Sequence, residues 1–298
     1  MSLELNDSVK TRIYLQKQQQ IQIKQLYEKM AQEVASRVEF LKQKGGSYWL
    51  QSIELQKLSQ KLQNDAQLIG QAEYSIIISN IKKCSESVIE AARNFNNSVG
   101  LTIEKAYMNV PKTIVDTLVS GQLYKGDWSL SYAIWTDVQN KQNDIVEIVA
   151  KGIGENKSAY EIAKDLEKYV NPNARKDWDW SKVYPGTSRK VDYNAQRLAR
   201  TMVSHAYQQS LERVCKYNPF VTGFIWHAAM TERTCELCAS RDGQFFEKGD
   251  LPLDHPNGMC TFEAAIPDDM NKIANRLADW ANGKKDKALD AWYQDMKS

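Results

Sequence analysis

Four residues near the C-terminal end of the chain have the types and spacing of metal ligands. They are Cys235, Cys238, His255 and Cys260, in the pattern Cys-x2-Cys-x16-His-x4-Cys. Two thiolates of a Cys-x-x-Cys turn can converge on one ion at about 2.3 Å, and a distant histidine and cysteine can complete the tetrahedron that Zn²⁺ prefers. Four protein ligands leave no open position for water. The spacing therefore predicts a structural zinc site that does not catalyse.

Two other states of these side chains remain open from the sequence. The thiols can stay reduced or hydrogen-bonded without a metal, or two of them can form a redox disulfide, which a reducing cytoplasm disfavours. Few apolar residues accompany the motif, so bound metal would supply folding energy to this segment. The apolar residues expected to be buried there are Phe245, Phe246, Leu251 and Leu253.

The surroundings of the motif argue against catalytic and DNA-reading roles. A zinc deaminase requires a ligand histidine two residues before a catalytic glutamate, upstream of its cysteine pair, whereas His227 is followed by two alanines. A DNA-reading finger needs basic residues between its ligand pairs, but acidic residues outnumber basic ones from Glu232 to His255. The other histidine, His205, falls within a predicted helix, and we expect both His205 and His227 to be structural.

Long helices are expected before the motif. Apolar residues recur every three or four positions from 23 to 41, which predicts an amphipathic helix that ends at the "KGGSYW" segment, residues 44–49. A second helix is predicted through residues 55–69, with Gly70 at its end. A third is predicted from Ile76 to about Phe95, with Cys84 as a small core residue.

The middle of the chain reads as shorter helices. Pro111 and Gly121 are placed to begin and end one of them. A further helix is expected to turn four side chains inward and to be followed by one that ends at Gly152 or Gly154. The inward side chains are those of Trp128, Ile134, Trp135 and Val138.

Local sequence signals predict the structure of the segment that precedes the motif. Ser158 and Glu161 have the spacing of a capping box at the start of a helix. Residues 171–190 combine turn-forming, aromatic and basic residues and are predicted to form a long loop. A helix from Asp192 and a strand through residues 221–226 then lead into the cysteines. A last helix, interrupted at Gly283, follows Pro267.

These signals predict a mainly α protein with a small α+β C-terminal domain, in which long N-terminal helices precede a Cys/His-stapled module. The expected divisions are a helical N-terminal arm and hairpin at 1–110, a helical middle region at 111–190, the Cys/His domain at 191–267 and a helical tail at 268–298. No apolar run approaches the roughly 20 residues that span a bilayer, and the N-terminus lacks the pattern of a signal peptide. We therefore expect a protein of the cytoplasm without a membrane partner.

One segment of the chain is locally basic, although the net charge of the 298 residues is only +2. Basic residues outnumber acidic ones between Lys10 and Lys44, and such an arm can lie near DNA or can simply be solvated. The basic residues are Lys10, Arg12, Lys17, Lys24, Lys29, Arg37, Lys42 and Lys44.

The motifs together resemble the phage Mu F-like family, the head morphogenesis or minor capsid proteins of tailed phages. The resemblance is carried by "RLARTMVSHAYQQS", "GFIWHAAMTERTC", Cys-x-x-Cys before "RDGQFF", and "HPNGMCTFEAAIP". It covers about residues 192–267, and "WSLSYAIW" and "KGIGENKSAYEIAKDLEK" upstream support it more weakly. Met202 replaces a common glutamate of the family, and Gly258 and Met259 stand where the family commonly has an additional cysteine. The roles of that carboxylate and of that possible ligand are therefore not carried over.

The resemblance implies a structural virion component present in few copies. Such a protein associates with the portal protein or the major capsid protein in the host cytoplasm during assembly, and it accompanies DNA packaging or ejection. Its expected location is the phage head. The basic stripes of the N-terminal helices can pack against other subunits or lie near packaged DNA.

Two alternatives from other classes remain. Mu F-like domains resemble modules found with toxins, so an ADP-ribosyltransferase-like pocket is conceivable around Arg200, Thr201, Trp226 and Glu232, although the ordered motif set of such enzymes is missing. The other alternative is a nucleic-acid-binding protein that acts through the basic arm, with affinity that falls steeply with salt.

Overall fold

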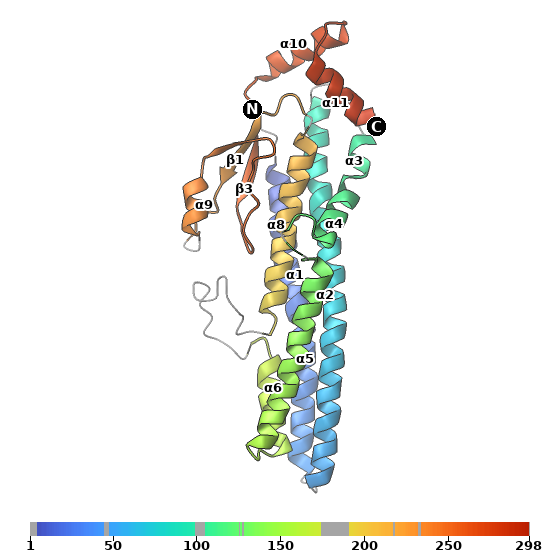
Figure 1. The fold of residues 1–298 in the computed structure, drawn as a ribbon, viewed down its shortest axis with the longest axis vertical. Coiled ribbons are helices and arrows are strands. Elements are labelled where there is room, and N and C mark those ends of the chain that lie inside the picture. The colour runs from blue at the N-terminus through green and yellow to red at the C-terminus, as the bar shows by residue number, and fades with distance from the viewer. Residues whose placement is uncertain are drawn as a thin grey trace. The chain divides into compact units, whose positions relative to one another are not determined.

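The computed structural model describes residues 5–44, 48–98, 105–124, 126, 128–173, 191–216, 218–231 and 234–297. Most of the predicted loop 171–190 lies outside these residues, as do residues 45–47 of the predicted helix break. The described part is mainly helical with a small C-terminal sheet, as the sequence predicts (Figure 1). None of its helices combines the length and the apolar character that a membrane span requires.

The chain forms two compact units, each built from segments that are distant in sequence. Unit 1 comprises Met1–Lys17, Ile77–Leu123 and Arg200–Ser298, and unit 2 comprises Gln18–Ile76 and Tyr124–Ala199. The division of the chain into four consecutive regions, expected from the sequence, stays a prediction.

Two helices make up the N-terminal part of the chain. Helix α1 (Asn6–Lys44) ends where the sequence predicts, but α2 (Tyr48–Ser98) is one continuous helix. The prediction that Gly70 ends a helix was therefore wrong. A Cβ atom at Gly70 would lie 2.5 Å from Cγ2 of Val138 in α5 (Leu130–Gly154), so this glycine permits two helices to approach closely. That packing offsets the roughly 1 kcal/mol that glycine costs within a helix.

In unit 2, parts of α1 and α2 lie beside α5 and α6 (Ala159–Val170) (Figure 1). Ser158 and Glu161 form the predicted capping box. Ile134 and Val138 are buried as expected, but Trp135 is 58% exposed. That prediction was wrong because one residue along a helix rotates the side chain by about 100°, away from the buried stripe.

Unit 1 contains α3 (Lys105–Met108), α4 (Val110–Ser120), α10 (Met270–Ala281) and α11 (Lys287–Lys297). Pro111 lies in the first turn of α4, and Gly121 follows its end in the left-handed region, as predicted. Gly283 separates α10 from α11. Cys84 is fully buried, and its Sγ lies 3.6 Å from the carbonyl oxygen of Val203. It is thus a core residue.

The sheet of unit 1 has three antiparallel strands in the order β2-β1-β3. These are β1 (Gly223–His227), which the sequence predicts, β2 (Phe245–Glu247) and β3 (Thr261–Ala265). Trp226 pairs with Phe262, and both are buried. Phe245 is 51% exposed, contrary to expectation, because successive side chains of β2 point to opposite faces and Phe246 is the one that packs on Trp226.

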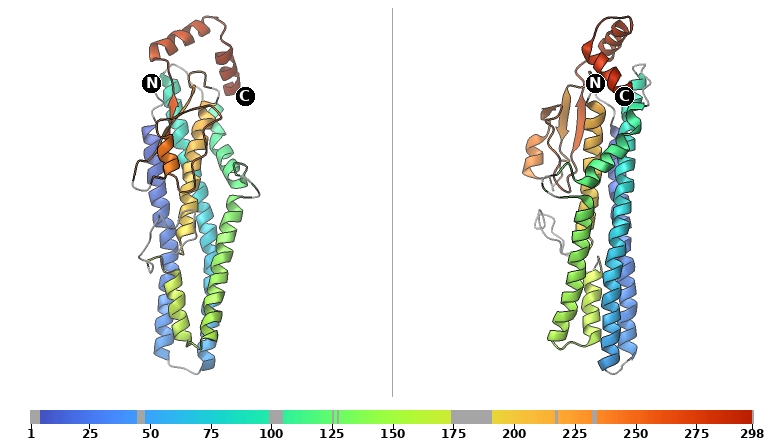
Figure 2. Two further views of the ribbon diagram at one scale, coloured as in Figure 1. Left: turned by 60° about the vertical axis from the view of Figure 1, so that its left-hand side comes forward. Right: turned by 45° about the vertical axis from the view of Figure 1, so that its right-hand side comes forward.

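Helix α8 (Tyr193–Cys215) runs alongside this sheet (Figures 1 and 2). The ring of Tyr207 stacks on Phe262, with the ring centroids 6.4 Å apart. The segments before and after β2 include the short helix α9 (Glu236–Arg241) and the predicted metal ligands. We call α9, the three strands, their connecting segments and the part of α8 from Arg200 onward the Cys/His module.

Candidate metal centre

The structure brings all four predicted ligands into one cluster in two overlapping groups. Cys235, Cys238 and His255 form the first group, and Cys238 and Cys260 form the second together with Asp254. Within each group the potential ligand atoms lie within 4.8 Å of one another. The cluster could therefore hold a metal ion, and the sequence analysis missed one of its members, Asp254.

The Cys-x-x-Cys turn positions the first group. Cys235 precedes α9 as its N-cap residue, and Cys238 follows in the first turn. The backbone N–H of Cys238 donates to Cys235 Sγ at 3.4 Å. Such a donor stabilises negative charge on sulfur, as a metal-bound thiolate requires.

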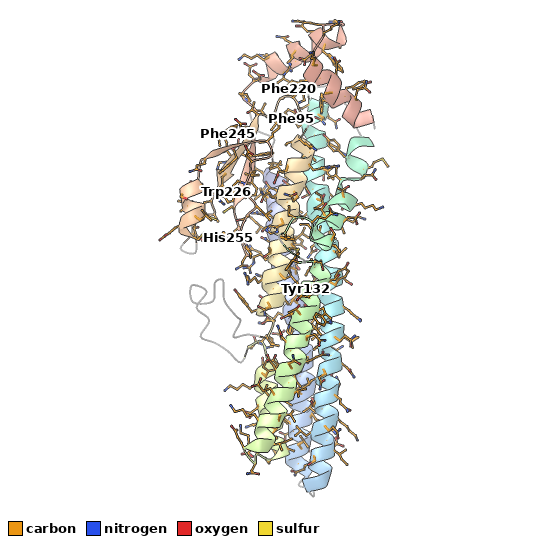
Figure 3. The ribbon with its side chains drawn as sticks, viewed as in Figure 1. Phe95, Tyr132, Phe220, Trp226, Phe245 and His255 are labelled. Carbon is orange, nitrogen blue, oxygen red and sulfur yellow. The ribbon has the colours of Figure 1, made fainter. Side chains whose placement is uncertain are left out.

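His255 presents one ring nitrogen to this pair. Its Nε2 lies 3.4 Å from Cys235 Sγ, while its Nδ1 lies 3.0 Å from the carbonyl oxygen of Pro256. A hydrogen bond from Nδ1–H to a carbonyl selects the neutral tautomer whose Nε2 carries a lone pair. The imidazole therefore has the orientation of a metal ligand. His255 and Trp226 both lie in the Cys/His module (Figure 3).

Asp254 is 2% exposed and belongs to the second group. Its Oδ1 accepts a hydrogen bond of 2.9 Å from the backbone N–H of His255. Its Oδ2 is buried and has no hydrogen-bond partner among the described residues. Gly258 packs so closely on this carboxylate that a Cβ atom there would collide with it. Burial raises the pKa of Asp254, while the charges of His255 and Arg12 and the backbone N–H groups of His255 and Cys260 act in the opposite direction.

The thiols of the second group are buried as well. Burial raises the pKa of Cys260, and the charge of Asp254 adds to this effect, while Cys238, the backbone of Ala229 and the Trp226 indole act in the opposite direction. Burial also raises the pKa of Cys238. The thiols are therefore neutral without a metal, and metal binding would release their protons.

One face of α8 holds the segment from Pro252 to Gly258, which we call the His-Pro loop. The polar side chains of that face belong to Arg200, Thr201, Ser204, His205 and Gln208. Thr201 Oγ1 accepts from the backbone N–H of Asn257 at 2.9 Å, and Ser204 Oγ donates to the Gly258 carbonyl at 2.9 Å. The loop therefore obtains from α8 the main-chain hydrogen bonds that regular structure would otherwise supply.

Gln208 and His205 continue this contact. Gln208 accepts from the Asp254 N–H at 3.0 Å and donates to the Pro252 carbonyl at 2.9 Å. His205 Nε2 lies 2.9 Å from the Asp254 carbonyl oxygen, and burial lowers the pKa of His205 to about 4. A neutral His205 thus donates to the loop, which agrees with its expected structural role. His227 lies 3.1 Å from the Glu263 carboxylate across the sheet.

Arg12 of α1 also binds the centre from within unit 1. It was counted with the basic arm, yet it is 1% exposed. Its guanidinium donates to the carbonyl oxygens of Cys260 at 2.6 Å and Met259 at 3.1 Å, and it lies 5.0 Å from the centroid of the Tyr207 ring. The carbonyl dipoles and the ring face compensate its buried charge. Arg12 is therefore not part of a charged surface.

Comparisons with known proteins do not identify the chain, because no protein-family model, curated protein or solved structure matches it.

Proposed function

We propose that the chain is a minor capsid or head morphogenesis protein of a tailed phage, without enzymatic activity. In this role it joins the portal protein or the major capsid protein in the host cytoplasm and becomes part of the phage head. It then accompanies DNA packaging or ejection as a structural component.

The observation that carries this proposal is the convergence of the motifs that resemble the Mu F-like family. The Arg-Thr segment of α8 binds the His-Pro loop, and Thr201 reaches the motif residue Asn257 directly. The strand motifs pair along β1 and β3, from Gly223 with Ala265 to His227 with Thr261. Motif segments that are separated in sequence thus build one structural module, which supports their reading as a family signature.

We further propose that the metal is zinc, held by Cys235, Cys238, His255 and Cys260 in a structural role. Three thiolates and one imidazole form one of the donor sets that structural zinc sites use. Cys238 and Cys260 are buried, so the ion would be shielded from solvent. Zinc would stabilise the His-Pro loop and α9 against each other.

The contacts of the residues named for an ADP-ribosyltransferase-like pocket favour the non-enzymatic role. Arg200 donates to Asn257 Oδ1 at 2.6 Å, Thr201 accepts from the same residue, and Trp226 is fully buried. Glu232 lies outside the described residues. Labelled NAD incubated with the protein should leave no label on the chain or on host proteins.

The proposed contact with packaged DNA rests on fewer cations than the sequence suggests. Arg12 is buried, Lys24 pairs with Glu28 at 3.4 Å, and Arg37 pairs with Glu54. We therefore propose that assembly with the portal or capsid protein is the main role of the chain, and that contact of the basic arm with DNA is secondary. A steep loss of DNA affinity with salt, without capsid binding, would favour the nucleic-acid alternative instead.

Co-sedimentation tests the proposed function. The purified chain is mixed with assembled portal rings or with empty capsid shells and then centrifuged, with the chain alone as the control. We expect saturable recovery with one of the two assemblies. Recovery with neither assembly would contradict the proposal.

A further inference from the structure

The four predicted ligands do not account for one buried acidic group beside them. Asp254 lies next to His255 in sequence and shares a group of close donor atoms with Cys238 and Cys260. Its Oδ2 has no hydrogen-bond partner among the described residues, although the side chain is almost completely buried. Buried polar groups are rarely left unpaired without a reason.

We propose that Asp254 is itself a metal ligand, through Oδ2, in the group that it forms with Cys238 and Cys260. The inference rests on metal binding at this centre, which is part of the proposed function.

The geometry of the carboxylate separates its two oxygens into different roles. Oδ1 is held by the backbone N–H of His255 at 2.9 Å, which fixes the orientation of the group. One carboxylate oxygen of Asp254 lies within 4.8 Å of the Sγ atoms of Cys238 and Cys260, and Oδ2 is the oxygen without a hydrogen-bond partner among the described residues. Donor atoms this close can share one ion, because Zn²⁺ binds carboxylate oxygen at about 2.0–2.2 Å and sulfur at about 2.3 Å.

Asp254 could instead only orient the first residue of the His-Pro motif through Oδ1. That role needs a single acceptor, which asparagine also provides at the same size. A ligand role needs the negatively charged Oδ2. In asparagine this position holds either the amide nitrogen or an uncharged amide oxygen. The substitution Asp254→Asn therefore separates the two roles.

Cobalt substitution of the full-length protein provides the test, since Co²⁺ occupies zinc sites and its absorption reports the ligands. We expect Asp254→Asn to change the d–d bands of the Co²⁺ protein and to weaken Co²⁺ binding by roughly ten-fold or more, the least that loss of a supporting ligand contact costs. The matched control is Asp242→Asn. Asp242 accepts from the Ala228 N–H at 2.8 Å and belongs to neither ligand group, so its loss should leave the spectrum and the affinity unchanged.

A second variant keeps the test decisive if Asp254→Asn does not fold. If position 254 contributes a ligand, Asp254→Cys places a fourth thiolate on the Co²⁺ ion. The thiolate-to-cobalt charge-transfer absorption should then rise by about one third. A wild-type spectrum and affinity in Asp254→Asn, or no added absorption in Asp254→Cys, would overturn the inference alone. Failure of the wild-type chain to bind Co²⁺ would overturn the metal centre as well, whereas the assembly role is tested separately by co-sedimentation.

Discussion

Several buried polar side chains of unit 2 bind one another, whereas several of the Cys/His module bind the main chain of a loop. In unit 2, Tyr27 donates to Glu73 at 2.7 Å, and Lys141, which is also buried, pairs with Asp137. In the module, Ser204 and Gln208 bind backbone groups of the His-Pro loop.

The difference follows from what each backbone already provides. Helices satisfy nearly all of their own N–H and C=O groups, so apolar stripes can assemble unit 2 and its polar network is additional. The His-Pro loop has no regular hydrogen-bond pattern and few apolar residues to bury. It therefore depends on α8 for hydrogen bonds and, on our proposal, on a metal ion for folding energy. The two regions should respond to different perturbations.

The largest effect is expected from Cys238→Ser, because Cys238 belongs to both ligand groups. Structural zinc contributes on the order of 10 kcal/mol to small metal-binding domains, so the module should unfold while the helices of unit 2 stay intact. Metal analysis and far-UV circular dichroism measure the two parts of this result. Cys215→Ser is the control, since Cys215 is buried in α8 outside both groups, and it should keep its metal. Full metal content in Cys238→Ser would refute the assignment.

A smaller effect is expected when α8 loses its contact with the loop. Gln208→Ala leaves the Asp254 N–H and the Pro252 C=O without this partner and also removes a hydrogen bond to Glu212. Each buried unpaired group costs about 1–3 kcal/mol, so the free energy of unfolding should fall by about 4 kcal/mol in urea denaturation. Gln209→Ala removes only a bond to Glu212 and should change stability by less than about 1 kcal/mol. Equal losses in both variants would argue against the role of this face of α8.

Unit 2 should instead respond to pH through Glu73. Burial raises the pKa of Glu73 to about 7, although the charge of Lys141 acts in the opposite direction. The folded state then keeps a proton that the unfolded state releases above its lower pKa, so stability falls as pH rises from about 4.5 to about 7 and changes little above. The full effect is about 3 kcal/mol.

Glu73→Gln should remove the share of this slope that Glu73 contributes in denaturation measured between pH 5 and pH 8. Glu212 of α8, whose pKa burial also raises to about 7, should keep its own share. Gln can still accept the hydrogen bond from Tyr27, so the network keeps its packing. The control, Glu39→Gln, replaces an exposed carboxylate of α1 and should leave the slope in place. A slope that is undiminished in Glu73→Gln would assign the pH response of unit 2 to another group.

The smallest effect is expected at the start of α6. Ser158 and Glu161 form a capping box, and Ser158→Ala should lower the free energy of unfolding by about 1 kcal/mol. Thermal denaturation measures this change, which should be the same with and without a metal chelator. If the loss of unfolding free energy changed when a chelator was added, the stability of unit 2 would also depend on the metal.

Local patterns were sufficient to predict much of the fold. Helical periodicity, the capping box and the turn at Gly121 depend on neighbours in sequence, and the structure confirms each of them. Gly70 was misread because its role depends on Val138 in another helix. Trp135 was misread because it directly follows the buried Ile134, and one residue along the helix rotates its side chain out of the buried stripe.

The candidate site was also predictable only where a local sequence pattern shows it. The Cys-x-x-Cys spacing and the distant histidine and cysteine indicated the cluster, since ligand types and spacing are visible in sequence. Arg12 and Cys260 are 248 positions apart, so no local pattern could join them. Asp254 stood beside His255 as one acidic residue among several, and only its burial distinguishes it.

Region-resolved hydrogen exchange of the full-length chain, with and without metal, tests the contrast between the two regions most directly. Removal of the metal should abolish protection in residues 234–262 and leave α5 and α6 protected at their original level. Unchanged protection of residues 234–262 in the metal-free chain would contradict a metal-stabilised module.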